Sequence, residues 1–190
     1  MNIISGTAKG IILESPKGLS VRPTSARAKK SLFDSYRNWM GKTVVDLFAG
    51  TGAFGLEAAS RGAENVYFIE KLYKNCKLIA KNVEKVRKAG VNANMEVICF
   101  DAINAHKRLP RFRGKIDVIF ADPPYNIADE VSKEILKNKA FATWASEALF
   151  IFEAPSEISR KPVFDNFDLW KIKSRRKLGQ STFFILNVND

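Results

Sequence analysis

From Lys42 onward, short apolar runs alternate along the chain with segments that have helical periodicity. Each run is short enough for one strand, and a glycine-rich or polar stretch ends most of them. Strands that alternate with helices predict a parallel sheet with helices on both faces. The five expected strands span residues 43–48, 66–70, 95–100, 116–121 and 148–153.

The end of the chain has a different pattern, because two β-rich runs follow each other without a helical segment between them. These runs span residues 167–173 and 181–188. The linker between them, residues 174–180, has a turn-like composition. We therefore expect an antiparallel hairpin added to the edge of the parallel sheet.

The segment 71–89 divides into an apolar face and a basic face at helical spacing. The basic face predicts a solvated surface, with a phosphate-binding stripe as the alternative. The apolar positions are Leu72, Cys76, Ile79, Val83 and Val86, and the basic ones are Lys71, Lys74, Lys77, Lys81, Lys85 and Lys88.

Residues 1–40 resemble an extension rather than part of the repeating pattern. Residues 2–13 are β-rich and broken by two glycines, which predicts a short hairpin. A helix is expected to begin at 23–25, with Ala28, Leu32, Phe33, Tyr36 and Trp39 on its buried face and Arg22, Arg27, Lys29, Lys30 and Arg37 around the rest. We place a boundary near Gly41, with an N-terminal extension at 1–40 and the main domain at 41–190.

The chain is strongly basic, with 31 Lys and Arg against 20 Asp and Glu and a net charge of +11. Such an excess favours a polyanionic partner, with nucleic acid the first candidate and an anionic membrane surface the second. No apolar run is long enough to span a bilayer, and the first residues lack the pattern of a signal peptide. We expect a cytoplasmic protein of one compact domain with a small appendage.

The few cysteines and the single histidine narrow the possible chemistry. Cys76 and Cys99 lie far apart in the sequence, which favours two reduced, buried thiols. With His106 they are too few for a structural zinc site, and we expect no metal. A polar stretch surrounds His106, so a surface histidine is favoured over a member of a catalytic triad.

A glycine-rich turn follows the first expected strand and opens a helix. Gly50, Gly52 and Gly55 match the fingerprint of a nucleotide-binding turn, in which the backbone must approach the ligand closely. Glu70 ends the next strand, where a carboxylate can accept hydrogen bonds from both hydroxyls of a ribose. Asp101 follows the third strand and could meet an adenine edge. NAD and S-adenosylmethionine both remain compatible with this turn.

A second motif, Asp122-Pro123-Pro124-Tyr125, directly follows the expected strand 116–121. Ligands of parallel sheets collect at the carboxyl ends of the strands, so this loop should share a rim with the glycine turn. Two prolines stiffen the loop. A stiff loop with an acid and an aromatic ring suits a flat base, because the ring can stack while the acid and a carbonyl accept hydrogen bonds from an exocyclic amine.

Such a site would solve a chemical problem. The exocyclic amine of guanine or adenine is a poor nucleophile, because its lone pair is delocalised into the ring. Two acceptors that draw its hydrogens toward a tetrahedral arrangement localise the lone pair, and the nitrogen can then attack the methyl group of a sulfonium in line. Positioning supplies much of the rate enhancement.

Together these motifs resemble the class I S-adenosylmethionine-dependent methyltransferases. The chain is most similar to the RsmD-type family of 16S ribosomal RNA guanine-N2 methyltransferases. Besides the glycine turn and Asp122–Tyr125, the resemblance rests on Ile3-Ile4-Ser5-Gly6, Arg22-Pro23-Thr24 with Arg27, Leu32-Phe33, Glu153 and Gly179-Gln180-Ser181-Thr182. Ser5 stands where the family has a glycine, and Lys30 where it usually has an acidic residue.

The resemblance implies a Rossmann-like, doubly wound, seven-stranded sheet, with the C-terminal hairpin and the N-terminal extension. It implies transfer of a methyl group from S-adenosylmethionine to N2 of one guanine in 16S rRNA of the small ribosomal subunit. Separately, we expect a monomer, although the sequence leaves the oligomeric state open. The implied cofactor residues are Asp46, Phe48, Gly50, Thr51, Gly52, Glu70, Asp101 and Ala102. The implied catalytic residues are Asp122, Pro123, Pro124 and Tyr125, and those near the RNA are Arg22, Thr24, Arg27 and Tyr125.

Three other functions are compatible with part of the sequence. DNA or RNA adenine-N6 methylation also uses an Asp-Pro-Pro-Tyr loop, although the chain has no insertion large enough for a DNA-reading domain. An NAD(P) oxidoreductase explains the glycines and Glu70 but gives Asp122–Tyr125 no role. A catalytically silent RNA-binding assembly factor explains the charge but requires neither carboxylate.

Overall fold

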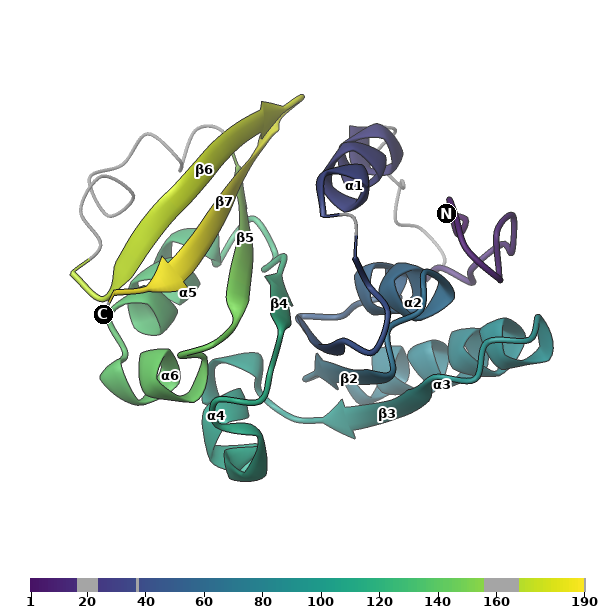
Figure 1. The fold of residues 1–190 in the computed structure, drawn as a ribbon, viewed down its shortest axis with the longest axis horizontal. Helices are drawn as coiled ribbons and strands as arrows, with labels where there is room; N and C mark the ends of the chain where they lie inside the picture. Colours follow the sequence, from purple (N-terminus) through teal and green to yellow (C-terminus); the bar gives the residue numbers. More distant parts are fainter. Residues whose placement is uncertain (17–23, 37, 156–167, 190) are drawn as a thin grey trace.

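The computed structural model describes residues 1–16, 24–36, 38–155 and 168–189, with the backbone alone at 24–28 and 155. Within these residues, seven strands form one sheet in the order β3-β2-β1-β4-β5-β7-β6 (Figure 1). The first five strands pair in parallel, and β7 is antiparallel to both of its neighbours. The strands are β1 (Thr43–Leu47), β2 (Asn65–Glu70), β3 (Asn94–Cys99), β4 (Val118–Ala121), β5 (Leu149–Pro155), β6 (Trp170–Leu178) and β7 (Ser181–Val188).

Helices cover both faces of the sheet, and each face has its own hydrophobic core. Side chains alternate along β1 as strand geometry requires, so that Val44 joins one core and Val45 the other. The expected doubly wound sheet with a C-terminal hairpin is confirmed. One face carries α1 (Thr24–Ser35), α2 (Ala53–Ser60) and α3 (Tyr73–Lys88), and the other η1 (Ala102–Asn104), α4 (Ala105–Arg108), η2 (Pro110–Phe112), α5 (Ala128–Leu136) and α6 (Lys139–Trp144).

The linker expected at 174–180 was wrong, because β6 continues through it to Leu178. Exposed and half-buried residues alternate along this segment, which is the period of a strand rather than the composition of a loop. Only Gly179 and Gln180 form the turn, and Gly179 has a φ of 67°. The hairpin is therefore long, and its turn projects at one end of the sheet (Figure 1).

Three local expectations also need correction. Leu72 precedes α3 instead of lying on its buried face, and 51% of it is exposed. Cys99 is exposed although Cys76 is buried. His106 is half-buried and packs nearly perpendicular to the Phe141 ring, and burial lowers the pKa of its imidazole. In the part of the chain that the structure describes, no helix has the length and apolar character needed to cross a membrane.

The N-terminal segment folds back on itself and docks on the end of α2. In place of regular strands, the expected hairpin has one antiparallel bridge, between Asn2 and Ile12. Gly6 lies so close to α2 that a Cβ there would come within 1.8 Å of the Ser60 carbonyl oxygen. The Ser60 hydroxyl accepts a hydrogen bond from the Ala8 amide and donates one to the Ser5 carbonyl. The boundary near residue 41 stays a prediction.

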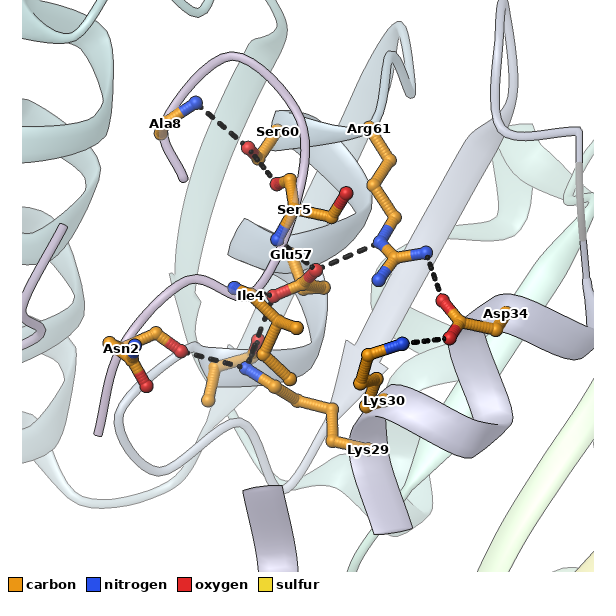
Figure 2. Close-up of polar contacts among 11 residues, drawn as sticks. Asn2, Ile4, Ser5, Ala8, Lys29, Lys30, Asp34, Glu57, Ser60 and Arg61 are labelled. Carbon is orange, nitrogen blue, oxygen red and sulfur yellow. Dashed lines mark hydrogen bonds and ion pairs between the residues drawn. The ribbon is translucent and has the colours of Figure 1, made fainter. Parts of the chain in front are cut away.

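A buried carboxylate, Glu57 of α2, joins this segment to α1 (Figure 2). It accepts hydrogen bonds from the amides of Ile4 and Ser5, at 2.8 and 3.1 Å. Its oxygens also form ion pairs with Lys29 at 3.4 Å and with Arg61 at 2.8 Å. Because Glu57 is fully buried, these four partners replace the water that the carboxylate loses on folding.

We predict that Glu57→Gln lowers the free energy of unfolding by about 3–5 kcal/mol, because it leaves the buried Lys29 ammonium without its counter-charge. Urea unfolding of the purified variants measures this. Glu84→Gln is the matched control, since Glu84 pairs with Arg87 on the exposed surface of α3 and should contribute less than about 1 kcal/mol. Equal losses in the two variants would contradict the assigned role of Glu57.

Candidate active site

A cavity of about 650 Å³ opens at the carboxyl ends of the parallel strands. This is the edge of an open α/β sheet at which ligands are expected. Its size is that of a site for a small molecule. Among the residues expected to act, the wall includes Asp46, Phe48, Gly50, Thr51, Glu70, Asp101, Ala102, Asp122, Pro123, Pro124 and Tyr125.

The glycine turn and the end of β2 are joined by the carboxylate of Glu70. One oxygen accepts a hydrogen bond from the Gly50 amide at 2.9 Å, and the other accepts one from the Leu72 amide at 2.8 Å. Phe48 and Gly50 both have positive φ, of 56° and 58°. A phenylalanine in this region is strained, and such strain is concentrated at functional sites. Glu70 is thus held at the cavity wall with its orientation fixed from both sides.

The third glycine of the turn has a packing role. A Cβ on Gly55 would come within 2.4 Å of the Phe68 ring, so only glycine lets α2 lie this close to the sheet. The Gly55 amide donates to Asp46 Oδ2 at 2.9 Å, which fixes that carboxylate below the turn. Gly52 caps α2 with a φ of 78° but does not line the cavity.

Asp46 is buried at the cavity wall, and its pKa is raised to about 7. Burial is the largest cause, and the charge of Glu70 adds to it. The Gly55 amide and the Lys29 ammonium act in the opposite direction by favouring the carboxylate. A carboxyl group whose ionised form is destabilised by burial and by a neighbouring charge is a candidate for binding a cationic ligand.

Asp101 and two apolar side chains complete the half of the cavity that contains Asp46 and Glu70. Asp101 follows β3 and caps η1, with Oδ1 accepting from the Ile103 amide at 3.2 Å and Oδ2 facing the Lys71 ammonium at 3.4 Å. Leu72 and Ile103 contribute apolar surface to the same wall. Carboxylates beside apolar surface suit a ligand that has both hydroxyl groups and a flat ring.

The other half of the cavity contains the Asp122–Tyr125 loop, which follows β4 directly. The Tyr125 hydroxyl lies 2.8 Å from the Ser181 hydroxyl at the start of β7, so a hydrogen bond connects the loop to the C-terminal hairpin. Glu153 of β5 and Phe183 of β7 line the same half. The expected meeting of the two motifs in one cavity is present in the structure.

Comparison with known proteins shows the family. The model of the family described as "Conserved hypothetical protein 95" matches residues 1–187. The chain belongs to this family. Together with the relatives described next, this match confirms the resemblance to the RsmD-type methyltransferases and the α/β methyltransferase fold.

Members of the family and a solved structure are similar to most of this chain. "Ribosomal RNA small subunit methyltransferase D" of Escherichia coli K12 is 30% identical over 191 residues, which cover 96% of this chain and 87% of the relative. "Putative rRNA methyltransferase YlbH" of Bacillus subtilis is 38% identical over 129 residues, or 66% and 67% of the two chains. The structure "Putative methyltransferase yhhF from Escherichia coli" superposes with a TM-score of 0.74 at 28% identity, covering 100% of this chain and 98% of that one.

Several residues of this family member reach the cavity without having been expected there. Lys29 was placed with the exposed basic residues of α1, but only 2% of it is exposed and it lines the wall. Its spacing to Leu32, Phe33 and Tyr36 is the i, i+3, i+4, i+7 of a buried face, which could have revealed it. Met1, Leu72, Ile103 and Phe183 were also missed, because only packing brings them to the wall.

Three residues expected near the RNA cannot be placed at the cavity. Arg22 lies outside the described residues. Thr24 and Arg27 belong to α1, whose backbone is described at these positions without the side chains. Their roles stay predictions.

We predict that Asp46 makes the protein less stable as pH rises from about 4 to about 7. In this range the unfolded chain has already lost the proton that the folded carboxyl retains, so folding must take it up again. Asp46→Asn removes this titration while keeping an acceptor for Gly55. The variant should therefore gain about 4 kcal/mol over the wild type across that range, as measured by urea unfolding at each pH. Asp168→Asn, at an exposed position, is the control, and a parallel pH profile for wild type and Asp46→Asn would refute the prediction.

Proposed function

We propose that this chain transfers a methyl group from S-adenosylmethionine to the exocyclic N2 of a guanine in 16S rRNA. One observation supports this most strongly. A single cavity has carboxylates suited to a cationic nucleoside at one end and a rigid acidic–aromatic loop suited to a flat base at the other. Membership of the family, and the names of its rRNA-methylating relatives, agree with this chemistry.

The donor set of the first half fits S-adenosylmethionine. Glu70 would accept hydrogen bonds from the ribose hydroxyls, and Leu72 and Ile103 would pack on the adenine ring with Asp101 at its edge. Asp46 would face the positive charges of the methionine part. The backbone of Gly50 and Thr51 would approach the ligand closely. When bound, S-adenosylmethionine supplies an electrophilic methyl group.

The second half would hold and activate the base. Tyr125, bonded to Ser181, would stack on the guanine ring. Asp122, with a carbonyl of the proline loop, would accept hydrogen bonds from the exocyclic amine and localise its lone pair. As the amine accepts the methyl group it would lose a proton, and Asp122 would receive it. Asp122 need not be a strong base, because the amine becomes acidic only as the methyl group arrives.

The RNA would approach from the side of the N-terminal extension. We propose that residues 1–40, with Arg22, Thr24 and Arg27, contact the RNA and that the substrate is the small ribosomal subunit or its precursor in the cytoplasm. The net charge of +11 favours such a polyanionic partner. The chain would act as a monomer and without a metal.

We predict that Asp122→Ala lowers the rate of methyl transfer by about a thousandfold, because it removes the acceptor that activates the amine. Single-turnover assays with methyl-labelled S-adenosylmethionine and 16S rRNA measure the rate. Cofactor affinity, measured by calorimetry, should be unchanged. Glu147→Ala is a matched control, since this exposed carboxylate precedes β5 at the opposite edge of the sheet and should leave the rate unchanged. A wild-type rate of methyl transfer in Asp122→Ala would contradict the proposed mechanism.

The identity of the product tests the substrate assignment. 16S rRNA from cells that lack the protein, treated with the purified enzyme and digested to nucleosides, should contain N2-methylguanosine by mass spectrometry. N6-methyladenosine in its place would support the adenine alternative and overturn the guanine assignment. The absence of any methylated nucleoside would favour a silent RNA-binding factor.

A further inference from the structure

The edge strand β6 carries an unusual concentration of positive charge. Its nine residues contain five basic side chains and no acidic one. Among the strands that the structure describes, it lies at the end of the sheet and pairs with β7 alone. The basic residues are Lys171, Lys173, Arg175, Arg176 and Lys177.

Most of these charges have no carboxylate partner among the described residues. Within the described residues, Lys171, Lys173, Arg176 and Lys177 take part in no ion pair, whereas Lys30, Lys42, Arg61, Lys85, Arg87 and Lys133 each face a carboxylate. All of the strand's basic residues except Arg176 are exposed. The Arg175 guanidinium lies over the Phe184 ring at 4.9 Å, which holds it against the strand.

Because β6 pairs with β7, the end of this basic strand lies beside the cavity. Arg176 lies opposite Phe183, and Leu178 opposite Ser181, so Arg176 shares a face with two residues of the cavity wall. Arg175 and Lys177 point to the other face, so cations flank both sides of the hairpin near its turn. The turn residue Gln180 itself lines the cavity, and Ser181 is bonded to Tyr125 in the base-binding half.

The basic face of α3 is a less suitable route. α3 begins beside Leu72 and Asn75, which line the cofactor half of the cavity. Its cations are partly engaged, since Lys85 pairs with Glu14 and Lys77 lies over the Tyr73 ring. The hairpin, in contrast, contacts the base-binding half directly through the bond between Ser181 and Tyr125.

We propose that the β6–β7 hairpin is a docking strip for the phosphate backbone of the RNA, and that it delivers the target base to the Asp122–Tyr125 half of the cavity. This inference rests on the proposed function. Arg175 and Lys177 lie on one face about 6.6 Å apart, and Lys171 and Arg176 lie on the other, so several phosphates can be neutralised along the strand. Each neutralised phosphate releases counterions, so the RNA affinity falls more steeply as the salt concentration rises.

The test compares two double variants with the same change of charge. Arg176→Gln with Lys177→Gln alters the strip, and Lys74→Gln with Lys81→Gln alters the exposed face of α3. Binding to an in vitro 16S rRNA transcript is measured across a range of KCl concentrations. The strip variant should bind about tenfold more weakly near physiological salt, with a slope of log affinity against log salt that is shallower by about 1.4, or 0.7 for each lost contact. The α3 variant should change affinity less than about twofold.

Several outcomes would overturn the docking strip. The first is a strip variant that keeps the wild-type RNA affinity and salt slope. The second is an α3 variant that loses as much RNA affinity as the strip variant. The third is a wild-type protein that does not bind the transcript. Increased self-association of the strip variant with RNA binding intact would show that the lysines only protect the sheet edge. The proposed function fails separately, if wild-type protein binds RNA through the strip but transfers no methyl group to it.

Discussion

The parallel pairing of β1, β2, β3 and β4 is the constraint on which the rest of the structure depends. Adjacent parallel strands end at the same edge, so residues far apart in the sequence meet there without any long-range recognition between them. Asp46, Glu70, Asp101 and Asp122 each come from the end of a different strand or the loop after it. With Glu153 of β5, the sheet thus gathers five acidic residues around one cavity in a chain that is otherwise strongly basic.

Bringing acidic side chains together and burying them costs free energy. Nearby hydrogen-bond donors and a cation offset part of that cost. Glu70 is satisfied by two backbone amides, and Asp46 by one amide and the nearby charge of Lys29. The compensation at Asp46 is incomplete, which is why its pKa stays raised. Residual cost of this kind is characteristic of groups that are retained for a ligand rather than for stability. Glu57 is the contrast, because each of its partners belongs to the protein and its role is to attach the N-terminal segment.

The sequence allowed the sheet and the chemical motifs to be predicted because both depend on local pattern. The glycine turn must follow a strand, and Asp122–Tyr125 must follow another, so their meeting at one rim follows from parallel topology alone. The spacing of Lys29 matches the buried face of α1, but the carboxylate that makes burial of a lysine acceptable there, Glu57, is distant in sequence, so burial was not predicted from the spacing. The length of β6 was missed because its charged residues resembled a loop, although their alternation is that of an edge strand. The bond between Tyr125 and Ser181 likewise depends on how the hairpin returns to the sheet.

The central claim is that one cavity brings a sulfonium methyl group and an activated base together. A crystal structure of the protein with S-adenosylmethionine bound tests it most directly. The account predicts the ribose on Glu70, the adenine beside Leu72 and Ile103, and the methyl group directed at the space between Asp122 and Tyr125. That space should allow a base nitrogen to approach the methyl carbon within about 3–3.5 Å. A ligand bound elsewhere, or a methyl group turned away from Asp122 and Tyr125, would contradict the account.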